Sequence, residues 1–392
     1  MNNLKKALVV LLTFFYFFRP QLFHPMLSTA LIPAAIGWFQ FMFNKNIRML
    51  TWQRTGVLFW FSFSFIFLWA LFIDLGTGGI LSAGPRSFTA SNIRFLFVTV
   101  GGGICIALVF ARGDKKELMS LMVKAVVTQI AIGIVMLFFP ELKRFIYIYI
   151  SGYSGSEKIF YDWFFYTRIF GWSEELFYLA PVLMTFILSL FFYKPQRIFS
   201  NLFFIVSIAI SLMNARLAIL GVIWGLMIRT GFIKTTLFFL LLVPLVLGVM
   251  TLYFQDNPIY NLIFSEFEGG RSRTFDILIE HHLIWLGKDS FDFILGPMAY
   301  VHAGERKVTV DIGWLIIGNF GGVLFILAWV ALLISLCDKA FVTMQLKLLA
   351  FIMLALFGFK GLLFSSNAII NMMVVFSLIG GVSAEFIRKD YR

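Results

Sequence analysis

Long apolar runs separated by short polar intervals organise this chain. Most runs have the roughly 17–25 residues with which an α-helix crosses a hydrocarbon core about 30 Å thick. None shows the alternation over about ten residues that is typical of a membrane β-barrel strand. The pattern predicts an all-α integral membrane bundle with about twelve transmembrane helices, at residues 6–18, 26–43, 56–73, 95–111, 118–139, 176–193, 198–213, 217–229, 235–254, 311–336, 341–363 and 368–387.

Composition supports a membrane protein and excludes a soluble globular domain. Hydrophobic residues make up 60% and charged residues 13% of the chain, with a mean hydropathy of +0.90, far from the averages of soluble domains. The longest polar interval, from Asp256 to Asp311, lies inside the apolar pattern and leaves no room for a separate soluble domain. We therefore expect residues 1–392 to form a single polytopic membrane domain.

The cysteines and the N-terminus do not change this prediction. Cys105 and Cys337 lie in or beside apolar segments in opposite halves of the chain, so a disulfide framework or a cysteine zinc site is not expected. Lys5 and Lys6 precede a short apolar run that lacks the small-x-small cleavage site of a signal peptide. This run is interpreted as the first, retained span.

Cationic residues are distributed unevenly between the two sides of the predicted bundle. With the N-terminus inside, the cytoplasmic side holds 18 of the 32 lysines and arginines but five of the 20 acidic residues. The positive-inside rule therefore predicts cytoplasmic termini in a bacterial inner (cytoplasmic) membrane. It places two long loops, 140–175 and 255–310, in the periplasm. The pI of about 9.7 follows from this topology and gives no support to nucleic-acid binding.

The first periplasmic loop, 140–175, is rich in aromatic residues. One reading is an interfacial aromatic belt on a re-entrant or surface helix. The other is a surface that stacks on sugar rings or guides a polyprenyl tail. In the second reading, the candidate acceptor-sugar residues are Trp163, Tyr166, Arg168 and Trp172.

The second periplasmic loop, 255–310, concentrates the chain's polar chemistry. Apolar residues recur at helical spacing over 272–286, which predicts an amphipathic helix ending near Trp285. Arg271 and Arg273 would then stand at its N-terminus, where the helix dipole and free N–H groups also favour an anion. A phosphate group is the ligand that this combination favours.

Other candidate residues have both a structural and a functional reading. Arg216, in a short polar break before a span, either extends to the lipid head groups or pairs with a bound anion. His281 and His282 are either ordinary interfacial residues or a base near neutral pH. Asp311 either caps the tenth span or acts as a carboxylate at the membrane face. The histidine spacing does not suit a metal, and no catalytic metal is expected.

The order of several motifs resembles a known family. Arg216 opens a span, Gly269-Gly270-Arg271-Ser272-Arg273 begins the large loop, and an amphipathic stretch ends in Trp285. A Leu295-Gly296 turn and the run Gly318-Asn319-Phe320-Gly321-Gly322 follow. This order, over roughly residues 205–335, resembles the bacterial O-antigen polymerase (Wzy) and O-antigen ligase (WaaL) superfamily of integral-membrane glycosyltransferases.

The resemblance implies a GT-C-like fold and a metal-independent, inverting transfer without a cofactor. It implies a lipid-linked donor, an undecaprenyl-pyrophosphate-linked oligosaccharide, and a chain-length regulator protein as a partner. Arg216, Arg271 and Arg273 would correspond to the arginines that bind the pyrophosphate. Fixed guanidinium groups suit a pyrophosphate leaving group because they stabilise its developing charge. The acceptor hydroxyl would lose its proton to Asp311 or, failing it, to His281, His282 or His302.

One departure from the family pattern separates the possible activities. Ligases carry a His-Asn pair before the helix that follows the large loop, whereas this chain has Val310-Asp311-Ile312 there. This favours a polymerase of lipopolysaccharide O-antigen or another surface polysaccharide over a ligase that transfers polymer to lipid A-core. A lipid-linked oligosaccharide flippase is the non-enzyme alternative. Transporters usually have two similar halves and charges at the bilayer midplane, and neither feature is evident here.

Overall fold

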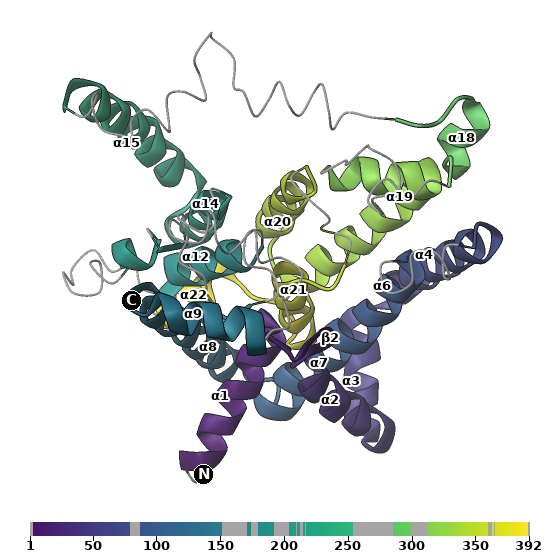
Figure 1. Cartoon of the computed structure of the whole chain (residues 1–392), viewed down its shortest axis with the longest axis horizontal. Helices are drawn as coiled ribbons and strands as arrows, with labels where there is room; N and C mark the ends of the chain where they lie inside the picture. Colours follow the sequence, from purple (N-terminus) through teal and green to yellow (C-terminus); the bar gives the residue numbers. More distant parts are fainter. Residues whose placement is uncertain are drawn as a thin grey trace. The chain divides into compact units, whose positions relative to one another are not determined.

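The computed structural model is mostly helical (Figure 1). It describes residues 3–78, 87–150, 171–173, 179–191, 204–208, 210–211, 215, 217–253, 285–298, 312–359, 363 and 365–390. The chain divides into two compact units, each with its own contacts. Unit 1 comprises Met1–Arg229, Ala328–Ala355 and Ser365–Arg392, and unit 2 comprises Thr230–Leu327 and Leu356–Phe364. The expectation of one membrane domain over residues 1–392 stays a prediction.

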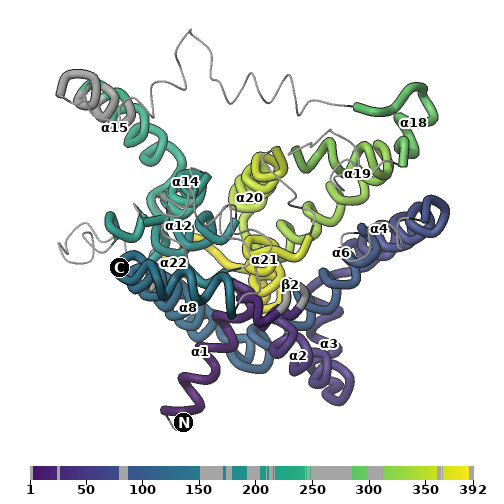
Figure 2. Tube along the Cα trace, viewed as in Figure 1, coloured from purple at the N-terminus to yellow at the C-terminus, as the bar shows by residue number. Residues whose placement is uncertain are grey.

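The chain up to Thr230, coloured from purple to teal in Figure 2, supplies most of the helices of unit 1. They are α1 (Asn3–Phe18), α2 (Leu31–Phe43), α3 (Lys45–Thr55), α4 (Val57–Gly76), α6 (Phe88–Arg94), α7 (Gly102–Ile104), α8 (Lys115–Phe138), α9 (Pro140–Phe145), α12 (Leu179–Phe191) and α14 (Ala218–Thr230). Three π-helical stretches are η2 (Phe95–Gly101), η3 (Cys105–Phe110) and η4 (Ile146–Ile150). A short antiparallel hairpin, β1 (Gln21–Leu22) and β2 (His24–Ser28), follows α1.

The second half contributes the remaining described elements. They are α15 (Phe232–Tyr253), α18 (Ser290–Leu295), α19 (Gly313–Ala340), α20 (Met344–Phe357), α21 (Ala368–Leu378) and α22 (Ala384–Asp390). Unit 2 holds α15, α18 and the beginning of α19. Within unit 2, a Cβ atom at Gly358 would lie 2.6 Å from Trp314 Nε1, so the turn after α20 packs directly on the first turn of α19.

Four described helices are long and apolar enough to cross a membrane. They are Val57–Gly76, Phe88–Phe110, Lys115–Phe138 and Gly313–Ala340. Shorter apolar helices are Leu31–Phe43, Leu179–Phe191, Ala218–Thr230, Phe232–Leu242, Met344–Phe357 and Ala368–Leu378. The chain therefore has the helices of a membrane protein. The number of twelve spans and the GT-C-like arrangement stay predictions.

Two predicted spans have different ends in the structure. The span predicted over 26–43 begins as a helix only at Leu31, because the preceding residues form the hairpin. The span predicted over 368–387 is not one helix, since α21 ends at Leu378. Gly380 and Gly381 follow with φ values of 81° and 78°, a conformation that ends helices and that glycine adopts without strain.

Small residues let two pairs of elements in unit 1 pack closely, α2 with η2 and α7 with α1. A Cβ atom at Gly37 of α2 would lie 1.8 Å from the Gly101 carbonyl oxygen of η2. At Gly102 it would lie 2.3 Å from the ring of Tyr16 on α1. Contacts of this kind hold membrane helices together because close approach replaces the missing hydrophobic driving force with van der Waals packing. They place Tyr16 in the centre of unit 1, fully buried.

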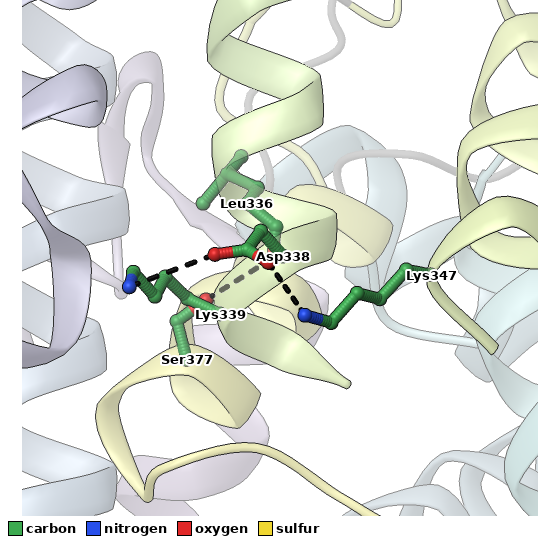
Figure 3. A network of polar contacts seen from close by, with 5 residues as sticks. All are labelled: Leu336, Asp338, Lys339, Lys347 and Ser377. Carbon is green, nitrogen blue, oxygen red and sulfur yellow. Dashed lines mark hydrogen bonds and ion pairs between the residues drawn. The ribbon is translucent and has the colours of Figure 1, made fainter. Parts of the chain in front are cut away.

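One end of unit 1 gathers cations that the topology assigns to the cytoplasm. Arg54 donates to the Leu378 carbonyl at the end of α21, and its guanidinium lies 3.5 Å from the Cβ position of Gly113, next to Arg112. Asp338 accepts from Lys347 at 2.5 Å and pairs with Lys339 at 3.6 Å (Figure 3). The Cβ position of Gly56, two residues after Arg54, lies 3.0 Å from the Lys339 side chain, so these groups lie close together in unit 1. The side of the membrane on which they lie stays a prediction.

Candidate functional site

In unit 2, residues 285–296 of the large polar loop lie against the glycine run of α19. The Leu286 N–H donates to Asn319 Oδ1 at 2.8 Å, and Asn319 Nδ2 donates to the Leu315 carbonyl at 2.9 Å. A Cβ atom at Gly318 would lie 3.0 Å from the Trp285 ring. Asn319 is fully buried, so its amide connects the loop to the helix where water is excluded.

Two glycines make the closest contact of this docked segment. Gly322 interrupts α19 with φ 69° and ψ −167°, a backbone conformation that is essentially restricted to glycine. A Cβ atom there would lie 2.3 Å from the Ile294 carbonyl oxygen and 2.4 Å from the Gly296 nitrogen. Gly296 itself has φ 84° and ends α18. The helix is thus kinked where the loop backbone approaches it, and side chains on either residue would prevent the contact.

The short helix α18 borders an open pocket of mixed chemistry. The pocket is lined by Trp285, Gly287, Lys288, Asp289, Ser290, Phe293 and Ile294. The Trp285 and Phe293 ring centroids are 6.0 Å apart, which is within the range of a favourable aromatic contact. Asp289 Oδ1 accepts from the Asp292 N–H at 2.8 Å, and Asp292 Oδ2 accepts from the Lys288 N–H at 2.9 Å. Two carboxylates therefore hold the turn, with aromatic rings and an exposed lysine beside them.

A second polar cluster lies inside the apolar core of unit 1. The Tyr16 hydroxyl donates to the carbonyls of Thr99, at 2.9 Å, and Asn371, at 3.1 Å. Asn371 Nδ2 donates to the Tyr16 carbonyl at 2.8 Å, and the Thr99 hydroxyl donates to Asn371 Oδ1 at 2.8 Å. Buried polar groups with mutual hydrogen bonds specify one arrangement of the helices around them.

Arg19 extends this cluster from the end of α1. It is 2% exposed and has a positive φ of 47°. Its Nη1 donates to the Ser366 carbonyl at 2.5 Å and to the Ser366 hydroxyl at 2.9 Å, and that hydroxyl lies 2.8 Å from the Thr99 hydroxyl. A buried arginine among apolar helices is costly and marks a functional-site candidate. Sequence reasoning missed it, although an arginine directly after an apolar span was a visible signal.

Thr99 belongs to η2, a π-helical stretch at the beginning of the span predicted over 95–111. Wider turns of this kind are frequent at functional sites because they redirect carbonyl groups from the regular α-helical ladder. Here the Thr99 carbonyl is an acceptor for Tyr16. The cluster therefore links the first span, the fourth span and the segment before the last span at the end of unit 1 that the topology places outside.

Most of the predicted site residues lie outside the part of the chain that the structure describes. These are Arg216, Arg271, Arg273, His281, His282, His302, Asp311, Trp163, Tyr166 and Arg168. The predicted amphipathic helix, 272–286, also lies outside it except for Trp285 and Leu286, which are not helical. Their assigned roles stay predictions.

Trp172 is the predicted acceptor-sugar residue that the structure describes. It is half-buried, and its backbone N–H donates to Gln129 Oε1 on α8 at 3.1 Å. The neighbouring Gly171 carbonyl accepts from the Tyr147 hydroxyl. The backbone of this segment is therefore held on α8 and η4, within unit 1.

The described residues contain no group of three or more His, Cys, Asp or Glu side chains that could hold a metal ion. Metal independence of a reaction stays a prediction.

Comparison of the whole chain with family models, with curated proteins and with solved structures gives no match.

Proposed function

We propose that this protein is a membrane glycosyltransferase that polymerises a bacterial surface polysaccharide. It would join undecaprenyl-pyrophosphate-linked repeat units at the periplasmic face of the inner membrane, inverting the anomeric centre of the donor. The support comes from the order of motifs in the sequence and from the helical membrane character of the chain. Transfer to lipid A-core is the competing activity.

One structural observation carries this proposal. Motifs that are separated in the sequence, Trp285, the Leu295-Gly296 turn and the run Gly318–Gly322, meet in one place in unit 2. The contact joins residues 285–296 of the large polar loop to the first turns of α19. A transferase acting on a lipid-linked donor needs this combination, because the pyrophosphate stays at the membrane surface while the sugars extend into water.

The pocket beside α18 suits the sugar part of such a substrate. Trp285 and Phe293 offer apolar ring faces, and the rim carries the Lys288 ammonium and the Asp289 carboxylate. Sugars combine apolar C–H faces with hydroxyl groups, so aromatic faces next to fixed polar groups match both. In this proposal the pocket holds sugars of the acceptor or donor, and the reacting groups lie elsewhere in the loop.

The proposed roles of the arginines follow from charge. Arg216, Arg271 and Arg273 would bind the pyrophosphate, since a guanidinium forms two parallel hydrogen bonds to phosphate oxygens. A fixed cation that stabilises charge developing on a leaving group is worth several kcal/mol in a water-poor site. Asp311, or one of His281, His282 and His302, would remove the proton from the acceptor hydroxyl.

A strain lacking this chain would test the proposal by electrophoresis of its lipopolysaccharide or other surface glycan. We expect the ladder of chain lengths to disappear while a single repeat unit remains attached to the acceptor. Loss of every repeat with accumulation of lipid-linked polymer would instead show a ligase. Failure of lipid-linked repeats to reach the periplasm would show a flippase.

Point variants in the same strain test the pyrophosphate assignment. Arg216→Ala and Arg271→Ala are expected to abolish the ladder at normal protein level. Arg216→Lys should recover little of it, because an ammonium group cannot reproduce bidentate binding. Arg112→Ala, at an exposed position on the predicted cytoplasmic side, is the matched control and should keep a full ladder. A full ladder in both arginine-to-alanine variants would show that the assignment is wrong.

A further inference from the structure

The polar helix α3 differs from the apolar helices on either side of it. It has 11 residues, which amounts to about 16 Å, about half of the hydrocarbon thickness. Asn44 caps its start, since Asn44 Oδ1 accepts from the N–H groups of Asn46 and Ile47 at 3.0 and 3.3 Å. Gly56, with φ 80°, ends it and turns the chain into α4. The helix is therefore a separate element between two apolar helices.

One face of α3 is buried in unit 1. Ile47, Thr51 and Thr55 recur every four residues, and all are buried. The hydroxyls of Thr51 and Thr55 donate to carbonyls one turn earlier, at 2.8 and 2.7 Å. Because these polar groups are satisfied within the helix, this face packs against α2 and α21 at little cost. This packing fixes which face of α3 is buried and which face is exposed.

The opposite face combines cations with large apolar side chains. Lys45 and Arg48 are exposed, as are Met49, at 49%, and Trp52, at 50%. The Trp52 ring lies 4.6 Å from that of Trp60, at the start of α4. Apolar side chains with lysine and arginine on one helix are typical of helices that lie in the membrane interface, where the rings reach the acyl boundary and the cations stay among the head groups.

The segment that forms α3 carries positive charge and no negative charge. Residues 44–55 contain Lys45, Arg48 and Arg54 and no aspartate or glutamate. Asp338, which belongs to the same end of unit 1, already accepts from Lys347 and pairs with Lys339 (Figure 3). Lys45 and Arg48 are therefore exposed cations whose charge an anionic ligand would neutralise. The aromatic residues beside them indicate that this ligand is a membrane surface.

We propose that α3 binds the head groups of anionic phospholipids in the leaflet at the cationic end of unit 1. Lys45 and Arg48 contact the phosphate groups, and Met49 and Trp52 reach the upper acyl chains. Each cation near an anionic surface favours the anionic lipid by about fivefold. This site is independent of the proposed glycosyl transfer, because it belongs to a different part of the chain.

The test uses the full-length protein in phosphatidylcholine vesicles that contain a fixed fraction of a brominated lipid. The probe is either phosphatidylglycerol or phosphatidylcholine, brominated close to the head group. The contribution of Trp52 is the difference in fluorescence between the wild type and Trp52→Phe. We expect brominated phosphatidylglycerol to quench this contribution several-fold more than brominated phosphatidylcholine at the same fraction. The preference should be smaller in Lys45→Gln and in Arg48→Gln than in the wild type, and it should vanish in Lys45→Gln/Arg48→Gln.

The matched control is Lys5→Gln/Lys6→Gln, which removes the same charge from the exposed start of α1 and should keep the preference. Equal quenching by the two lipids in the wild type would overturn the proposal, as would a preference that survives in Lys45→Gln/Arg48→Gln. Loss of the preference in the control would assign it to overall charge instead of α3. The wild type provides a measurement that needs no variant: at about 1 M salt, where the screening length is about 3 Å, the preference should disappear.

Discussion

Gly322→Ala should release residues 285–296 of the large loop from α19. The native φ and ψ of Gly322 cost an alanine about 1–3 kcal/mol. The added Cβ would also lie 2.3 Å from the Ile294 carbonyl oxygen and 2.4 Å from the Gly296 nitrogen. Both of these atoms belong to the backbone and cannot rotate away. The conformational cost alone lowers the docked population about 5- to 150-fold, and the collision lowers it further.

Hydrogen exchange of the protein in lipid nanodiscs measures this population. The Leu286 amide is the reporter, because it donates to Asn319 in the docked state. The hydrogen exchange of this amide should accelerate at least about 5-fold, the lower limit set by the conformational cost of alanine. Gly318→Ala is the control, since its Cβ would meet the ring of Trp285 at 3.0 Å and the methyl end of Ile326 at 3.2 Å. These side chains can shift, so exchange should change much less.

Unchanged exchange at Leu286 in Gly322→Ala would refute the role of the glycine run in docking. The same variant also connects the structure to the proposed function. If the docked loop forms part of the transferase site, Gly322→Ala should shorten or abolish the ladder while the protein level stays normal. Fast exchange together with a full ladder would separate the docking from catalysis.

Further predictions concern the stability of unit 1. Asn371→Ala should destabilise the protein by about 1 to 3 kcal/mol, because it removes the amide that donates to the buried Tyr16 carbonyl and one of the two partners of the Thr99 hydroxyl. Melting in detergent should show a much smaller effect for Ser377→Ala, whose hydroxyl bonds only to carbonyls. Burial lowers the pKa of Lys143 from 10.5 to about 8, so its charged form is the costly one. Lys143→Met should therefore stabilise the protein most at and below pH 7.5, and the gain in melting temperature should fade as the pH rises from 8 toward 10.5. Gly221→Ala should weaken the packing of α14, since its Cβ would lie 2.3 Å from both Thr185 Oγ1 and the Val182 carbonyl oxygen. Gly248→Ala is the control, because a Cβ atom there meets nothing within 4 Å. Equal melting temperatures for these two variants would contradict this packing.

Helix existence could be read from the sequence, but helix ends and interruptions could not. Apolar runs predict helices because the backbone must satisfy its own hydrogen bonds in lipid, and α4 and α8 end within a few residues of the predicted spans. No pattern in the sequence indicated the interruption of α19 at Gly322. A glycine in an apolar run is compatible with a straight helix, and its positive φ depends on the loop backbone that approaches it.

The candidate site was predictable in part. The sequence pointed to the run Gly318–Gly322 and to Trp285 as parts of one motif order, and the structure brings them into contact. It gave no indication that Tyr16, Thr99 and Asn371 would share one cluster. Each of these residues is ordinary in its own segment. Their partners are up to 355 positions away in the chain, and local patterns carry no information about such pairing.

The sequence by itself indicated that this protein resides in a membrane, and it predicted on which side of the membrane its charges lie. Hydrophobicity and the positions of lysine and arginine act additively along the chain, so they can be read residue by residue. The tertiary structure alone decided which polar groups are buried together, which glycine kinks α19, and which face of α3 stays exposed. Those outcomes depend on close packing between distant segments, where a single Cβ atom or one hydrogen bond selects the arrangement.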